Sequence, residues 1–121
     1  MARGRLAHGE LERRVLEVLW DEGRAMTPRQ VHDRLVQGRE LAYTTTMTVL
    51  ARLWDKGRLD REPDGRTFRY QPRLTREETA ARRMSELLAV TGDGSVTLAR
   101  FVETLSPAQR AELRRMIGQD G

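Results

Sequence analysis

The spacing of hydrophobic residues predicts three helices in the first half of the chain. From Gly9 to Glu22, leucine and valine return every three or four positions, which is the period of an amphipathic helix. A second helix begins at Thr27 and runs to about Val36, because a threonine cap, a proline in the first turn and a glutamine three residues after the cap are typical of a helix start. A third helical stretch runs from Tyr43 to Gly57.

The third stretch has two different sides when it is laid on a helix at about 100° per residue. The side that we expect to pack on a core carries Thr46, Val49, Leu50 and Leu53. The opposite side carries Thr44, Thr48, Ala51 and Asp55, with Thr45, Met47 and Arg52 on its flanks. Threonine can offer a hydroxyl or a methyl group to base edges in a DNA major groove. The alternative is an ordinary amphipathic helix whose threonines face water.

After Gly57 the pattern changes from the helical period to the alternation of a strand. Arg58–Glu62 and Thr67–Gln71 flank the turn sequence Pro63-Asp64-Gly65, which predicts a β-hairpin. Three helices followed by a hairpin make up a winged helix-turn-helix.

The hairpin carries Arg58, Arg61, Arg66 and Arg69. Arginines on a wing can straddle a phosphate backbone, and we select Arg66 and Arg69 as candidate DNA contacts. The alternative is a solvated strand edge that charge protects from aggregation.

Two smaller features precede the third helix. We expect a short strand at Arg24–Met26. We expect His32 at the surface or at a helix cap, because no second histidine is spaced to share a metal ion with it.

Three further helices are expected beyond Pro72. Thr75–Glu78 is a capping box that opens a helix reaching about Val90, Ser95–Leu105 forms the next helix, and Ser106 caps the last. The candidate dimerisation residues on these helices are Met84, Leu87, Leu88, Leu98, Phe101, Val102, Leu105, Leu113, Met116 and Ile117. Helices this short cannot bury such faces by themselves, so we expect them to pair with a second copy of the chain. The alternative is that they fold back on their own winged helix.

The chain is therefore expected to be mainly α-helical with a small β wing. Residues 1–73 form a winged-helix DNA-binding domain, and residues 74–121 form a helical dimerisation domain. Charge follows the same division: residues 1–73 hold 15 Lys and Arg against 11 Asp and Glu, whereas residues 74–121 hold 7 against 7. This imbalance favours a polyanionic partner for the first part.

Composition excludes several classes of function. The 121 residues include no cysteine, which removes disulfides, thiolate metal sites and cysteine nucleophiles. There is also no histidine pair and no Gly-rich phosphate loop, so we expect neither an enzyme nor a bound metal or cofactor. No apolar run approaches the ~20 residues of a membrane span, and we expect a cytoplasmic protein without a membrane partner.

The motifs together resemble those of the penicillinase-repressor family, which includes repressors of the BlaI, MecI and CopY type. The resemblance rests on G-E-L-E-R-R-V-L-E-V-L-W, T-P-R-Q-V-H-D-R-L, Y-T-T-T-M-T-V-L-A-R-L-W-D-K-G and L-A-R-F-V-E-T-L-S, and it covers about residues 8–117. It implies a winged-helix homodimer that represses transcription at a palindromic operator of the TACA/TGTA type. By position, the base contacts would be Thr44, Thr45, Met47 and Thr48. Several members carry lysine and arginine where this chain has Thr44 and Met47, which implies an operator that differs in detail.

The resemblance also bears on the signal that lifts repression. Copper-responsive members sense metal through a cysteine-rich tail, which this chain lacks. In β-lactam-responsive members a sensor-protease pathway leads to a cut between Asn and Phe, and the matching bond here is Arg100–Phe101. The bond keeps its position, whereas arginine replaces asparagine before it.

Two alternatives to an operator-binding repressor stay open from the residues. One is a winged-helix regulator that a small molecule releases by binding at the C-terminal helices. The other is a winged helix that serves only for protein interaction.

Overall fold

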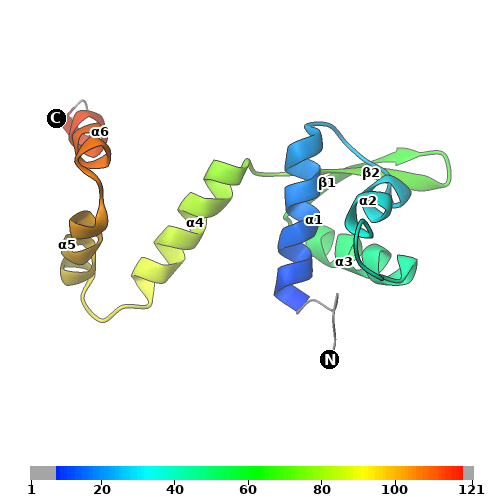
Figure 1. Ribbon diagram of the computed structural model, residues 1–121, viewed down its shortest axis with the longest axis horizontal. Helices are drawn as coiled ribbons and strands as arrows, with labels where there is room; N and C mark the ends of the chain where they lie inside the picture. Colours follow the sequence, from blue (N-terminus) through cyan, green and yellow to red (C-terminus); the bar gives the residue numbers. More distant parts are fainter. Residues whose placement is uncertain (1–7, 119–121) are drawn as a thin grey trace. The chain divides into compact units, whose positions relative to one another are not determined.

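Three helices and a β-hairpin form the first part of the chain, and three more helices follow (Figure 1). The computed structural model describes residues 8–118. The first part contains α1 (His8–Glu22), α2 (Pro28–Leu35), α3 (Tyr43–Asp55), β1 (Leu59–Asp64) and β2 (Thr67–Pro72). The second contains α4 (Arg76–Ala89), α5 (Gly94–Thr104) and α6 (Pro107–Gly118). The predicted fold, a mainly α-helical winged helix followed by further helices, is confirmed.

The chain divides into two compact units, Met1–Thr79 and Ala80–Gly121. The division lies within α4, so the first turn of that helix belongs to the winged-helix unit. The domain boundary that we predict after residue 73 falls a few residues earlier.

Apolar side chains from α1, α2, α3 and both strands meet in one core. The buried set is Leu11, Val15, Leu16, Leu19, Met26, Val31, Leu35, Val49, Leu50, Leu53, Leu59 and Tyr70. Thr46 is also fully buried, so α3 packs on the core through the side that its helical spacing predicts.

The hairpin turn differs from the prediction. The strands pair antiparallel from Leu59↔Pro72 to Asp64↔Thr67, so the two residues that connect them are Gly65 and Arg66. Pro63-Asp64-Gly65 is therefore not the turn, because Pro63 and Asp64 belong to β1. Gly65 has φ +63°, and glycine at the first central position of a two-residue turn suits the twist of paired strands.

The strand that we predict at Arg24–Met26 is reduced to one residue. Met26 forms a bridge with Tyr70, in which each backbone N–H donates to the other's carbonyl at 2.9 and 2.8 Å. The bridge cannot lengthen because Thr27 already caps α2 and accepts a hydrogen bond from the backbone N–H of Gln30.

The helices of the second unit have locally defined starts. Thr75 and Glu78 exchange reciprocal hydrogen bonds at the start of α4, and Ser106 and Gln109 do the same at α6. Asp93 caps α5 by accepting hydrogen bonds from two backbone N–H groups. Among residues 8–118, no helix is long and apolar enough to cross a membrane.

Candidate nucleic-acid interface

A buried contact joins α2 to α3, the two helices of the helix-turn-helix. His32 Nδ1 lies 2.8 Å from Thr46 Oγ1, and the ring of Tyr43 meets the imidazole edge-on at 5.3 Å between centroids. His32 is only 8% exposed, so the expectation of a surface or cap position is wrong. The physical reason is that Thr46, on the buried side of α3, supplies the hydrogen-bond partner that a buried imidazole needs.

A second set of contacts fixes α2 against the end of α1. Glu22 accepts hydrogen bonds from Arg24 Nε and from Arg34 Nη1, both at 2.8 Å. The hydrogen bond from Arg24 is the largest cause that lowers the pKa of Glu22, desolvation opposes it, and Arg34 adds to the lowering. The carboxylate thus joins the turn before α2 to the last turn of α2 itself.

The outer side of α3 carries the residues that the sequence selects for base contact. Thr44, Met47 and Thr48 are exposed, whereas Thr45 and Arg52 are half-buried on the flanks. The Thr48 hydroxyl donates to the carbonyl of Thr44 at 2.9 Å. Because its proton is engaged in the helix, the Thr48 side chain has acceptor lone pairs and a methyl group to offer a partner.

The two selected wing arginines lie in different surroundings. Arg66 occupies the second turn position, at the tip of the wing, and is exposed. Within residues 8–118 it makes no ion pair. Arg69 donates from Nε to Asp64 Oδ2 at 2.8 Å. Arg66 is thus the more available of the two for a phosphate.

Arg61 of β1 is not among the selected candidates, and its side chain packs between α3 and the second strand of the wing. The guanidinium carbon of Arg61 is 3.7 Å from the centre of the Trp54 ring and 4.0 Å from that of Phe68. Strand alternation places Arg61 on the same side of β1 as the buried Leu59. This position in the alternation is the feature of the sequence that distinguishes Arg61 from the other wing arginines.

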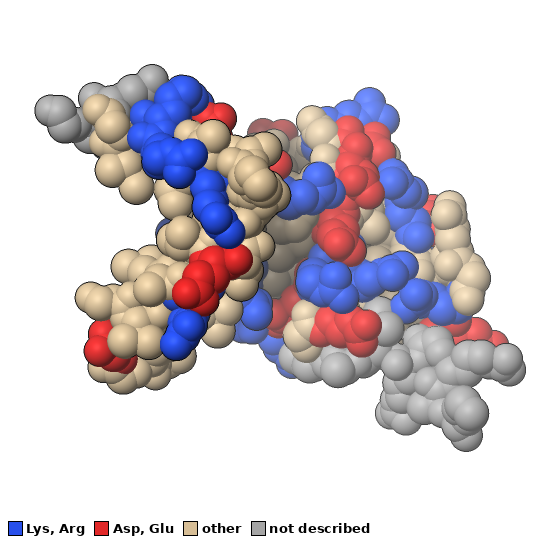
Figure 2. Space-filling view, turned by 60° about the vertical axis from the view of Figure 1, so that its left-hand side comes forward, with Lys and Arg blue, Asp and Glu red and all other residues tan. Residues whose placement is uncertain are grey.

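On the face of the winged-helix unit that Figure 2 shows, charge is not gathered into one broad patch. On the face in Figure 2, lysine and arginine side chains are interspersed with aspartate and glutamate. On this face a polyanion would meet individual basic side chains rather than a wide positive field.

The second unit exposes most of its apolar side chains. None of the described residues of α4, α5 and α6 is buried. In the predicted dimerisation set, Leu88, Leu105 and Leu113 are half-buried and the others are exposed, from 37% at Val102 to 65% at Ile117. These helices offer an apolar surface and have no core of their own.

The Arg100–Phe101 bond lies within helix α5. Phe101 is 41% exposed, and Arg100 Nη1 lies 3.3 Å from Glu103 Oε1. The bond is thus accessible at the side-chain level, although its backbone is helical.

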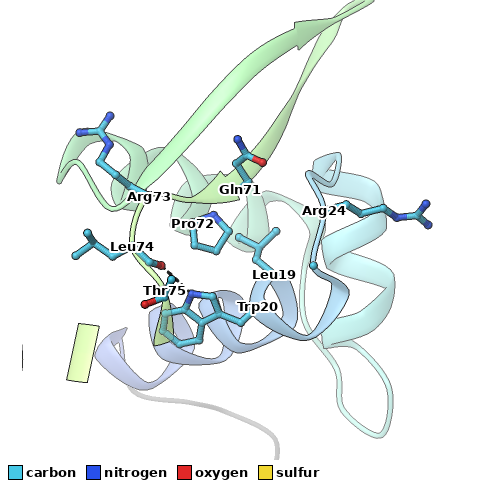
Figure 3. A pocket seen from close by; sticks show the side chains of 9 residues that line it. Leu19, Trp20, Arg24, Gln71, Pro72, Arg73, Leu74 and Thr75 are labelled. Carbon is cyan, nitrogen blue, oxygen red and sulfur yellow. Dashed lines mark hydrogen bonds between the residues drawn. The ribbon is translucent and has the colours of Figure 1, made fainter. Parts of the chain in front are cut away.

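A pocket of about 250 Å³ lies in the first unit, between the end of α1 and the segment that leads into α4 (Figure 3). The indole Nε1 of Trp20 donates to the carbonyl of Leu74 at 3.0 Å and closes one wall. Arg24 and Arg73 line the pocket, but Figure 3 shows their guanidinium groups pointing away from it. Its volume is below the roughly 300–1,000 Å³ of common ligand sites.

The chain is similar to known proteins in sequence and in fold. The family model described as Penicillinase repressor matches residues 8–119. The transcriptional regulator BlaI of Mycobacterium tuberculosis, in strains CDC 1551 / Oshkosh and ATCC 25618 / H37Rv, is 40% identical over 114 residues, which is 92% of this chain and 83% of the relative. The solution structure of the DNA-binding domain of the repressor BlaI has a TM-score of 0.50 and 28% identity, over 62% of this chain and 88% of that domain. The extent of these matches establishes that the chain belongs to the penicillinase repressor family.

Proposed function

We propose that this protein is a homodimeric transcriptional repressor that binds a palindromic DNA operator through α3 and the wing. The observation that carries the proposal is the division of α3 into a fully buried side and an outer side of small groups, where Thr44, Met47 and Thr48 are exposed. A helix with such a face fits a major groove, where threonine and methionine can reach base edges. Membership of the penicillinase repressor family, in which the similar BlaI of Mycobacterium tuberculosis is a transcriptional regulator, also supports a repressor function.

The homodimer is supported by the surface of the second unit. Exposed side chains such as Leu87, Phe101 and Ile117 would be removed from water by the same helices of a second copy. A two-fold dimer presents two recognition helices to half-sites one helical turn apart, which matches a palindrome. The resemblance to the family suggests half-sites of the TACA/TGTA type.

Release from the operator would follow a cut at Arg100–Phe101 by a protease pathway. The bond lies in α5, on the element that carries Leu98, Phe101 and Val102. A protease needs an extended backbone, so cleavage would require local opening of α5.

A binding experiment with three duplexes tests the proposal. The first duplex carries two TACA/TGTA half-sites one turn apart, the second carries one half-site, and the third has a scrambled sequence. We expect the palindrome to bind about 10³-fold or more tightly than the scrambled duplex at physiological salt, since specific and non-specific affinities differ by such factors. The single half-site should fall between them.

Sedimentation of the same samples reports the number of chains on each duplex. Two chains on the palindrome are expected. Equal affinity for all three duplexes would contradict the operator, and no salt-dependent binding to any of them would contradict DNA recognition altogether.

The ligand-released alternative has less support. It expects a pocket at the C-terminal helices, whereas the pocket in Figure 3 lies in the winged-helix unit. The guanidinium groups of its two lining arginines point away from it, so they are not placed to bind a ligand inside the pocket.

A further inference from the structure

Arg61 is held from both sides by aromatic rings. Trp54, in the last turn of α3, lies on one side, and Phe68 of β2 lies on the other, with distances of 3.7 and 4.0 Å from the guanidinium carbon to the ring centres. Arg61 itself is half-buried, and Trp54 is 38% exposed. The stack joins the end of the recognition helix to the wing.

The stack leaves the edge of the guanidinium without an acceptor. Within the described residues, Arg61 makes no hydrogen bond and no ion pair, whereas Arg69 and Arg73 each bond to an aspartate. A guanidinium is planar, so its two faces can take the rings while its N–H donors point outward in the plane. These donors are fixed in direction, and little side-chain freedom remains to be lost when they bind.

The position of the stack places it beside the outer side of α3. Trp54 follows Met47 by seven residues, about two turns, so both lie on the same flank of the helix. Arg61 of β1 packs on Trp54, so the wing contacts α3 on that flank. Two phosphate backbones border a major groove. If α3 enters such a groove, one of these backbones would run along the junction between α3 and the wing.

We infer that Arg61 is a phosphate ligand, preorganised by Trp54 and Phe68 at the junction of α3 and the wing. The inference rests on the proposed DNA-binding function and extends it to a residue that anchors the protein without reading sequence. Arg69 and Arg73 differ because strand alternation places them on the other side of the hairpin, where Asp64 and Asp60 neutralise them.

The test compares Arg61→Met and Arg61→Lys with the matched control Arg73→Met, in the full-length protein on the palindromic and the scrambled duplex. Arg61→Met and Arg73→Met remove the same charge from opposite sides of the wing, and circular dichroism verifies the fold of each. Because one phosphate contact contributes about 0.9 to the slope of log K against log salt, the binding deficit of Arg61→Met should shrink ~3.5-fold between 50 and 200 mM salt. The deficit should be similar on both duplexes.

The two other variants sharpen the result. Arg61→Lys keeps the charge but not the planar stack, so it should restore the salt slope while binding more weakly than the wild type. Arg73→Met should keep the wild-type slope. In NMR spectra, the Arg61 Nε–H of the free protein should be shifted upfield by the two rings and should move downfield when DNA is added.

Three outcomes would overturn the inference. Arg61→Met could bind as the wild type does, or it could lose the same factor at every salt concentration, which would make Arg61 a purely structural link. Arg61→Lys could also fail to restore the slope. In each case the wild type still binds DNA, so the proposed function stands; a wild type that binds no duplex would instead contradict that function.

Discussion

The ammonium group of Lys56 lies 3.0 and 2.9 Å from the two carboxylate oxygens of Glu12. Lys56 is the C-cap of α3, and Glu12 belongs to α1 and is only 6% exposed. The pair therefore fastens the end of α3 to α1.

Lys56→Met should destabilise the winged-helix unit by about 2 kcal/mol, because it leaves a buried carboxylate without its charged partner. The double variant Glu12→Leu/Lys56→Met should recover most of the loss, since no buried charge then remains. Urea unfolding measures both. A double variant as unstable as Lys56→Met would show that the carboxylate is not the source of the cost.

Thr48→Ala should weaken operator binding by about 1–3 kcal/mol without unfolding the protein, which is the cost of one base contact. Thr48→Ser and Thr48→Val separate the two groups of the side chain, since serine keeps the hydroxyl and valine keeps the methyl. Met47→Asp should lose more, because it sets a carboxylate against the phosphates. The affinities come from fluorescence anisotropy, and wild-type binding by folded Thr48→Ala and Met47→Asp would place this face away from DNA.

Arg66→Ala should lower the salt slope by about one unit and weaken binding to all duplexes alike, because a phosphate contact carries no base information. Its position at the tip of the wing, exposed and without an ion pair among the described residues, makes it the natural comparison with Arg61. An unchanged slope would mean that the tip of the wing does not reach the backbone.

A chain that ends at Arg100 should be soluble, mostly monomeric and a poor operator binder. It loses Phe101, Leu113, Met116 and Ile117, and each buried large side chain contributes on the order of 2–5 kcal/mol. That loss moves a dimer equilibrium by several decades. Sedimentation and gel-shift titration measure the two effects, and a dimer at micromolar concentration with normal operator affinity would place the interface elsewhere.

Acid should remove the contribution of Glu22 to stability. Its pKa is lower in the folded protein than the ordinary 4.5, chiefly through Arg24, so the contribution is complete above about pH 4.5 and fades as the pH falls toward the folded pKa. The stability difference between wild type and Glu22→Gln should thus be constant near neutrality and shrink in acid. Urea unfolding from pH 7 to pH 3 measures it. In a background of Arg24→Met the difference should be smaller throughout.

Helical spacing was sufficient to predict the buried side of α3, including Thr46, because that side follows from a fixed rotation per residue. It could not predict the burial of His32, since the partner hydroxyl lies fourteen residues away on another helix. The same limit applies to Arg61: alternation gives its side of the strand, but only the packed structure brings Trp54 against it. In the second unit, the pattern predicts the apolar faces and leaves open what covers them.

The capped starts of α4, α5 and α6 have a consequence for assembly. Helices of eleven to fourteen residues are marginal in water, and a good cap contributes about 0.5–2 kcal/mol toward forming each one. Because Thr75, Asp93 and Ser106 fix these starts through hydrogen bonds a few residues away, the positions where the helices begin do not depend on a partner surface. A second chain would meet helices whose starting residues are already specified, so contact between the two chains would determine how the apolar faces fit together and not where each helix begins.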